Sequence, residues 1–348
     1  MTIPRREVVH PEESGVYHCW SRCVRRAFLC GFDRLTGKNY DHRKEWTITR
    51  LIFLAQIFTI DVLAYAIMST HQHLMLRTKP HEAKALSDKE VARRWLHLFH
   101  NQEQWDYSNN EPTEQAIQAL MQDTERIAIL RDRLCSVSWF NRCLKENIAV
   151  KANKEDEVTG HFWEKRFDCQ RIEDPGALVT CMIYVDLNEI RAKVADRPEE
   201  SEFTSAFLRI VARQASTKAT QLQSKGEIIP EKLTKARESA NWLMSFPSAE
   251  EVQQTESVLP LTLDEYLIIL DETGKCHAEG KRGAISPELE SILERLNIRP
   301  DNWLDSSSSL PSRFSQVIGG ANSLKHAAKE LGKAWLKGAT AASLMFSC

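Results

Sequence analysis

Residues 62–77 restrict the possible folds of this chain more than any other stretch. Two apolar runs are separated there by Ser69 and Thr70, a pattern that predicts an antiparallel hairpin in the middle of a sheet. His71 and His73, at the start of the second run, are spaced two residues apart. Because successive strand side chains point to opposite faces, both imidazoles project from the same face. Such a pair binds a divalent cation when a third group approaches from elsewhere in the chain.

The composition is that of a soluble globular protein. Hydrophobic residues make up 42% and charged residues 27% of the 348 residues, a length that allows two domains. The formal net charge of −2 neither indicates nor excludes a nucleic-acid binder, because a local basic stripe matters more than the sum.

Cysteine usage and hydropathy favour a cytoplasmic protein. The nine cysteines include no CxxC pair, which indicates a reducing compartment and argues against a disulfide framework. The N-terminus lacks the apolar core of a signal peptide. The most hydrophobic run, residues 51–68, is interrupted by Gln56, Thr59 and Asp61, so we expect no membrane span.

Hydrophobic periodicity predicts further elements around the hairpin. A strand at residues 16–24 and a helix at 43–58 precede it, and a helix that begins at the capping box of residues 87–90 follows. Another helix is expected at 113–134. Residues 160–172 alternate aromatic with charged side chains, which favours a strand or a hairpin arm.

A change in composition divides the chain. Residues 213–238 are polar and contain few large apolar side chains. We therefore expect a first domain over residues 1–210, a polar linker or exposed helix over 211–245, and a small, all-helical accessory domain over 246–348.

A helix is predicted to begin at Asp174, with Pro175 at its first position, and to run to about residue 194. Tyr184, Asn188 and Arg191 are spaced i, i+4, i+7 and share a face that differs from the apolar stripe of this helix. The amide oxygen of Asn188 is our candidate third metal ligand. Tyr184 would then stand one helical turn from the metal.

A tyrosine beside a metal-bound phosphodiester can attack its phosphorus as a nucleophile. A phenol with an unperturbed pKa of about 10 is a poor nucleophile at neutral pH, so it must lose its proton and attack a polarised phosphorus. A metal ion provides that polarisation as a Lewis acid, and the product is a phosphotyrosine. The residues alone also allow a structural interpretation, in which the histidines and Tyr184 serve packing and Asn188 caps a helix end.

Four segments occur in the order found in one protein family. They resemble the single-tyrosine HUH transposases, and most of all the REP-associated tyrosine transposases of bacteria. The resemblance covers roughly residues 10–210, and the segments that carry it are 17–29, 65–76, 160–167 and 184–192.

The resemblance implies an α+β fold in which helices back a ferredoxin-like antiparallel sheet, the HUH endonuclease fold. It implies that His71, His73 and Asn188 hold Mg²⁺ or Mn²⁺ and that Tyr184 is the nucleophile. The expected activity is cleavage and rejoining of single-stranded DNA near REP-like hairpins through a 5′-phosphotyrosine. Such a protein would be nucleoid-associated and would act as a monomer or homodimer.

Two residues depart from the family pattern. Gln72 replaces a bulky hydrophobic residue between the histidines, and on a strand it faces the same way as Leu74 and Leu76. A buried glutamine needs partners for its amide. Glu189 stands where the family commonly has proline, and the sequence leaves open whether its carboxylate faces the metal.

Basic and aromatic residues suit contact with nucleic acid. We expect Trp20, Phe162 and Trp163 to stack unpaired bases, with core packing as an equal alternative. The residues expected to contact phosphates are Arg22, Arg25, Arg26, Lys165 and Arg166.

Two other functions remain compatible with the sequence. One is a domesticated hairpin-binding regulator that has lost cleavage, for which Gln72 is the support. The other is a zinc site formed by His71, His73 and a cysteine, which the lack of a nearby CxxC disfavours.

Overall fold

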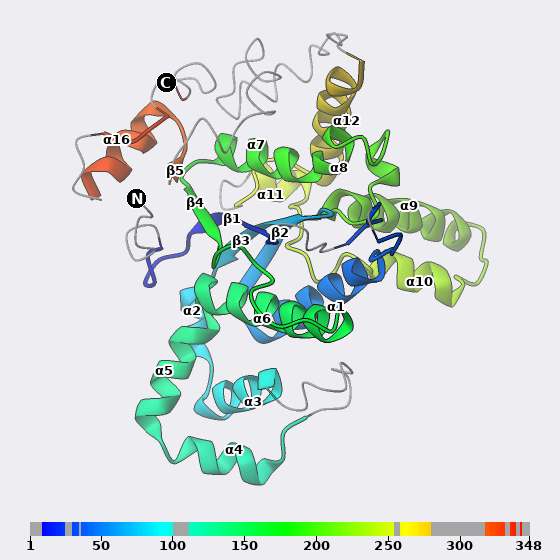
Figure 1. Cartoon of the computed structure of the whole chain (residues 1–348). Helices are drawn as coiled ribbons and strands as arrows, with labels where there is room; N and C mark the ends of the chain where they lie inside the picture. Colours follow the sequence, from blue (N-terminus) through cyan, green and yellow to red (C-terminus); the bar gives the residue numbers. More distant parts are fainter. Residues whose placement is uncertain are drawn as a thin grey trace.

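The computed structural model describes residues 9–24, 30–34, 36–99, 111–253, 258–279, 317–330, 335–338 and 342. These residues form an α+β fold in which helices cover both faces of a mixed five-stranded sheet with the order β2-β3-β1-β4-β5 (Figure 1). The strands are β1 (Val16–Arg22), β2 (Ile60–Ile67), β3 (His71–Thr78), β4 (Asp168–Ile172) and β5 (Val317–Ile318).

The predicted central hairpin is confirmed. Strands β2 and β3 pair in antiparallel fashion, and the backbone N–H of Met68 donates to the carbonyl of His71 over 2.8 Å at the turn. Strand β1 pairs with the other edge of β3, which places β3 in the interior of the sheet. A strand paired on both sides holds the direction of each of its side chains.

One face of the sheet is covered by α1 (His42–Ile57) and α6 (Val137–Glu155), which contact each other (Figure 1). Helix α1 was predicted, whereas α6 was not. Three of the buried residues of α6 are the polar Asn141, Lys145 and Asn147, so its apolar periodicity is blurred. Its first turn is capped by Ser136, whose hydroxyl accepts from the N–H of Trp139.

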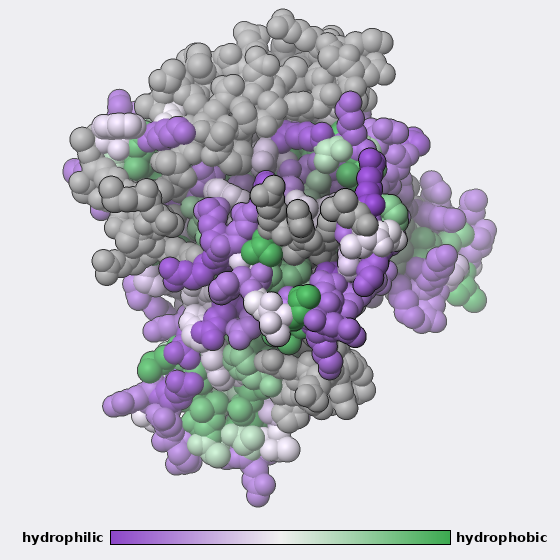
Figure 2. Space-filling view, viewed as in Figure 1, coloured by the Kyte–Doolittle hydropathy of each residue, from purple (hydrophilic) through white to green (hydrophobic). Residues whose placement is uncertain are grey.

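A helical lobe separates β3 from α6. Its members α2 (Pro80–Ala85), α3 (Asp88–Phe99), α4 (Glu114–Met121) and α5 (Thr124–Leu134) extend away from the sheet (Figure 1). The prediction of one helix over 113–134 was wrong, because Asp123 accepts from the N–H of Arg126 over 2.8 Å and starts a new helix. Figure 2 shows hydrophilic side chains over much of the described surface, with hydrophobic ones gathered on this lobe.

The opposite face of the sheet is covered by α7 (Pro175–Asp186), whose N-terminus is capped as predicted: Asp174 accepts from the N–H of Ala177 over 2.7 Å. The helix ends at Asp186 instead of continuing to residue 194. A short helix, α8 (Asn188–Arg191), follows after Leu187. The backbone N–H of Arg191 donates to the carbonyl of Leu187 over 2.9 Å, so the helical hydrogen-bond pattern resumes directly after α7.

Residues 211–245, predicted to be a linker or an exposed helix, belong largely to a helical pair. This pair is formed by α9 (Ser205–Ser224) and α10 (Glu231–Glu238), and α10 has no buried residue. Among the described residues, no helix has the length and apolar character needed to cross a membrane.

The expectation of an all-helical region after residue 246 needs correction. Strand β5 lies within it and pairs in parallel with β4, so the sheet is not purely antiparallel. A two-residue strand leaves no periodic signal, because its pairing depends on a distant partner. The described helices there are α11 (Ala249–Gln253), α12 (Leu263–Glu279) and α16 (Ala321–Glu330). Buried residues of α12 and α16 share one hydrophobic core with α7.

Candidate active site

The two predicted histidines lie on the same face of β3, the face covered by α7. Their ring centroids are 5.2 Å apart. Burial lowers the pKa of His71 to about 4 and holds that of His73 well below its usual value. Both imidazoles are therefore neutral at pH 7, which is the form that binds metal ions.

Helix α7 brings Tyr184 against this pair. The phenol ring meets the ring of His73 edge-on, with 5.6 Å between centroids and 84° between planes. Burial raises the pKa of Tyr184, while the nearby Arg191 opposes this shift. Two elements far apart in the sequence therefore bring together the residues that were predicted to act together.

Asn188, one turn further on, uses its amide nitrogen to cap the end of α7. Nδ2 donates to the carbonyls of Tyr184 over 2.9 Å and Val185 over 3.1 Å. The amide oxygen takes part in neither bond, so it is the atom of Asn188 suited to bind a metal. The predicted capping role and the predicted ligand role are thus compatible.

A third histidine, His18 of β1, joins this cluster and was not identified from the sequence. Its Nε2 lies 3.0 Å from Nδ1 of His73, and its ring is 5.9 Å from that of Tyr184. His18 is fully buried, and burial lowers its pKa to about 3. The available signal was the alternation of β1, which puts His18, Trp20 and Arg22 on one face.

By their chemistry, the three candidate ligands would suit a divalent transition metal. Two neutral imidazoles and an amide oxygen suit Mn²⁺ better than Mg²⁺, which prefers oxygen ligands. In the described part of the chain, no three His, Cys, Asp or Glu side chains are grouped so that they could hold a metal. Among those residues, no cysteine is therefore grouped with the two histidines as a zinc site would require.

Gln72 and Glu189, the two departures from the family pattern, point away from the face of the sheet that carries the histidines. Gln72 is 1% exposed on the α1 side, and within the described structure neither atom of its amide has a hydrogen-bond partner. The carboxylate of Glu189 lies 3.6 Å from Nζ of Lys44, and burial raises its pKa. Glu189 therefore pairs with α1 and not with the histidines.

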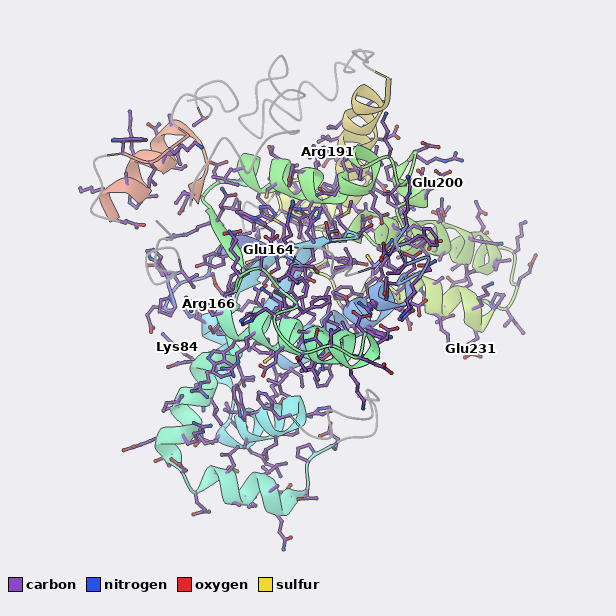
Figure 3. The ribbon with its side chains drawn as sticks, viewed as in Figure 1. Lys84, Glu164, Arg166, Arg191, Glu200 and Glu231 are labelled. Atoms are coloured by element: carbon purple, nitrogen blue, oxygen red, sulfur yellow. The ribbon has the colours of Figure 1, made fainter. Side chains whose placement is uncertain are left out.

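The residues expected to contact DNA have different surroundings. Arg22 is exposed and pairs across the strands with His71, so it borders the site. Lys165 and Arg166 are exposed and line a cavity of about 810 Å³ between α6 and residues 160–167. Figure 3 labels Arg166 in the segment that leads into β4. Arg25 and Arg26 lie outside the described residues.

Core packing is the role of two of the three aromatic residues considered for base stacking. Phe162 is 3% and Trp163 is 9% exposed, and Nε1 of Trp163 donates to the carbonyl of Lys145. Trp20 is partly exposed, and its ring lies 5.1 Å from that of His18.

Comparison of the chain with protein-family models, with curated proteins and with solved structures finds no match in any of the three. A function must therefore be inferred from the geometry of the site and from the sequence motifs.

Proposed function

We propose that this protein is a metal-dependent enzyme that nicks single-stranded DNA near hairpins and transfers the strand through a 5′-phosphotyrosine at Tyr184. The observation that carries the proposal is the edge-on contact between Tyr184 and His73. A tyrosine nucleophile and a metal-binding histidine pair have to be neighbours for this chemistry. Random packing of a tyrosine would not require histidines beneath it.

The order of the elements supports the HUH endonuclease fold within this proposal. Elements β1, α1, β2, β3, α6 and β4 follow one another in a β-α-β-β-α-β succession, with a lobe inserted before α6. The sheet order β2-β3-β1-β4 with antiparallel neighbours is that of a ferredoxin-like split β-α-β unit. The helix with Tyr184 then covers the free face.

Each residue of the site has a defined task in the reaction. His71, His73 and the amide oxygen of Asn188 would hold Mn²⁺ or Mg²⁺, which as a Lewis acid makes the phosphorus more electrophilic. Tyr184 loses its phenolic proton and forms the O–P bond, and the bond from phosphorus to the 3′ oxygen breaks. That oxygen leaves with a proton as a 3′ hydroxyl, and the 5′ phosphate stays on Tyr184. Rejoining reverses these steps with a new 3′ hydroxyl.

Exposed cations around the site support single-stranded DNA as the substrate. Arg22 stands at the end of β1 opposite His71, while Lys165 and Arg166 lie on the segment that pairs with this end of β1 through the backbone bond from Glu164 to Arg22. Contacts to phosphates set the position of the strand without reading its sequence.

A covalent-adduct assay tests the proposed function. Wild-type protein, incubated with Mn²⁺ and labelled single-stranded hairpin DNA, should retain label after denaturation, and Tyr184→Phe should retain none. Tyr40→Phe, which alters a tyrosine packed against Arg43 on α1, is the control and should behave as wild type. An adduct of equal yield in Tyr184→Phe would show that the nucleophile is another residue.

The unsatisfied amide of Gln72, in the strand that holds both histidines, favours one competing function. A hairpin-binding regulator without cleavage needs no metal at the histidines, so it can tolerate an unsatisfied polar side chain between them. Tight hairpin binding that does not depend on metal, together with no adduct in Mn²⁺ or Mg²⁺, would support the regulator instead of the enzyme.

A further inference from the structure

Arg191 contacts Tyr184 in two ways. From α8, its guanidinium carbon lies 4.7 Å from the centre of the phenol ring, and its Nη1 donates to the backbone carbonyl of Tyr184 over 3.4 Å. Figure 3 labels it on the side of the sheet that α7 covers. Within the described structure, Nε and Nη2 are shielded from solvent and have no hydrogen-bond partner.

Among the residues that the structure describes, no carboxylate balances the charge of this side chain. Burial lowers the pKa of Arg191 to about 10, so the guanidinium still carries its proton at pH 7. The acidic residues closest to it in the sequence are engaged elsewhere. Glu189 faces Lys44, and Asp186 accepts from the hydroxyl of Tyr266 over 2.5 Å. An unpaired buried cation is unfavourable, so an anion from outside the protein would stabilise this arrangement.

The unpartnered atoms define the shape of that anion. Nε and Nη2 lie on one edge of the guanidinium and present two parallel N–H groups. This fork matches two oxygens of a phosphate or a carboxylate. Arg191 packs on the ring of Tyr184, and its charge helps to lower the pKa of His73, so an anion bound to this edge would lie beside the candidate nucleophile.

We propose that Arg191 binds the two non-bridging oxygens of the phosphodiester that Tyr184 attacks. The anion site stands on the geometry of Arg191 itself, whereas its place in the reaction rests on the proposed function. By holding both oxygens, the fork orients the phosphorus toward the phenol and stabilises the charge on the phosphoryl group during transfer.

A purely structural role for Arg191 makes different predictions. In that case the ring contact and the bond from Nη1 would stabilise α7 and α8, and removal of the guanidinium would lower the melting temperature. An anion-binding arginine without its anion is a source of strain. The two roles are told apart by phosphate: an anion site predicts that phosphate raises the melting temperature through Arg191, whereas a purely structural role does not.

The first experiment measures anion binding without any DNA. The melting temperatures of wild type, Arg191→Gln and Arg191→Lys are followed while inorganic phosphate is titrated into an anion-poor buffer. The control is Arg197→Gln, which alters an exposed arginine paired with Glu200. Phosphate should stabilise wild type and the control, because a ligand that binds the folded state raises stability by mass action. The affinity of Arg191→Gln for phosphate should be weaker by about tenfold or more, with Arg191→Lys in between.

The second experiment asks whether the bound anion is the attacked phosphate. In the adduct assay, Arg191→Gln should form the phosphotyrosine about a hundredfold more slowly than wild type. Substitution of a methylphosphonate for the cleaved phosphodiester removes the charge that Arg191 would pair with. On that substrate the rates of Arg191→Gln and wild type should become nearly equal.

The outcomes separate this inference from the proposed function. If phosphate stabilises Arg191→Gln as strongly as wild type, the anion site is refuted. If wild type forms no adduct but phosphate binding depends on Arg191, the enzyme proposal fails while the anion site stands. Equal adduct rates for wild type and Arg191→Gln on the phosphodiester would refute the role of Arg191 alone.

Discussion

Nε2 of His18 lies 3.0 Å from Nδ1 of His73, so one of the two rings must donate its proton to the other. A metal on Nε2 of His73 requires the proton on Nδ1, and His73 is then the donor and His18 the acceptor. Such partners fix the orientation and the tautomer of metal-binding histidines, and their loss typically weakens metal binding by about 10- to 100-fold. His18 would thus act as a positioning residue for the candidate metal site.

The first prediction concerns this contact. His18→Leu removes the acceptor and should weaken Mn²⁺ binding by about 10- to 100-fold in a calorimetric titration. His18→Gln, which retains an acceptor, should bind Mn²⁺ more tightly than His18→Leu. An unchanged affinity in His18→Leu would show that His73 does not need this partner.

The stability of the protein should fall in mildly acidic solution. The pKa of His18 is lowered from 6.5 to about 3 in the folded state, so the unfolded chain binds a proton there that the folded chain does not. Stability from this group is complete above pH 6.5 and is lost as the pH falls toward 3. His18→Gln should reduce the slope of unfolding free energy against pH in this window by about 1.4 kcal/mol per pH unit.

The control for the pH experiment is the exposed His81. His81→Gln is titrated in parallel, because it removes an imidazole that stands at the surface and outside the buried cluster. A slope that does not change in His18→Gln would mean that the buried imidazole is charged in the folded protein.

Replacement of Gln72 by an apolar residue should stabilise the protein. Its amide is buried without a partner among the described residues, and so is the hydroxyl of Ser21, its neighbour across the strands. Gln72→Met keeps the unbranched shape and removes the unsatisfied group, and it should raise the unfolding free energy by about 1 to 3 kcal/mol in urea titrations. The exposed Gln118→Met should have little effect. Destabilisation by Gln72→Met would indicate a buried water that binds the amide.

The ion pair between Lys44 and Glu189 should hold α8 in place. Glu189→Gln leaves a buried ammonium, and Asp41, 3.5 Å from that ammonium, compensates only in part. We expect a loss of about 2 kcal/mol in unfolding free energy, below the range for a fully isolated buried charge. A lower adduct yield should accompany it, because α8 holds Asn188 and Arg191. The double variant Lys44→Met with Glu189→Leu should recover much of the stability if the pair acts as a unit.

Signals contained in a few neighbouring residues predicted much of the fold. The turn at Ser69 and Thr70, the cap at Asp174 and the spacing of two between the histidines all depend on local backbone geometry. The structure contains all three predicted features: the hairpin, the start of α7 after Asp174, and the two histidines on one face of β3. Helix α6 was missed because buried polar residues interrupt its apolar pattern.

The remaining parts depend on contacts between distant segments. His18 reaches His73 only through the register of β1 on β3, and β5 is a strand only because β4 offers a free edge. That the guanidinium of Arg191 has no carboxylate partner among the described residues could not be foreseen either, because it depends on Glu189 turning toward α1. Sequence patterns predicted Tyr184 and Asn188 as candidate site residues, whereas the partners that pack against them required the structure.

The bond from Tyr266 on α12 to Asp186 has a consequence for how this protein could be altered. Asp186 is the last residue of α7, two positions after Tyr184, and it also accepts from the hydroxyl of Ser205. The helix of the candidate nucleophile is therefore held between the sheet and a segment more than seventy residues downstream. Ending the chain at residue 210 would remove the donor to Asp186, and exchanging the C-terminal segment for that of another protein would change what packs against the helix of the candidate nucleophile.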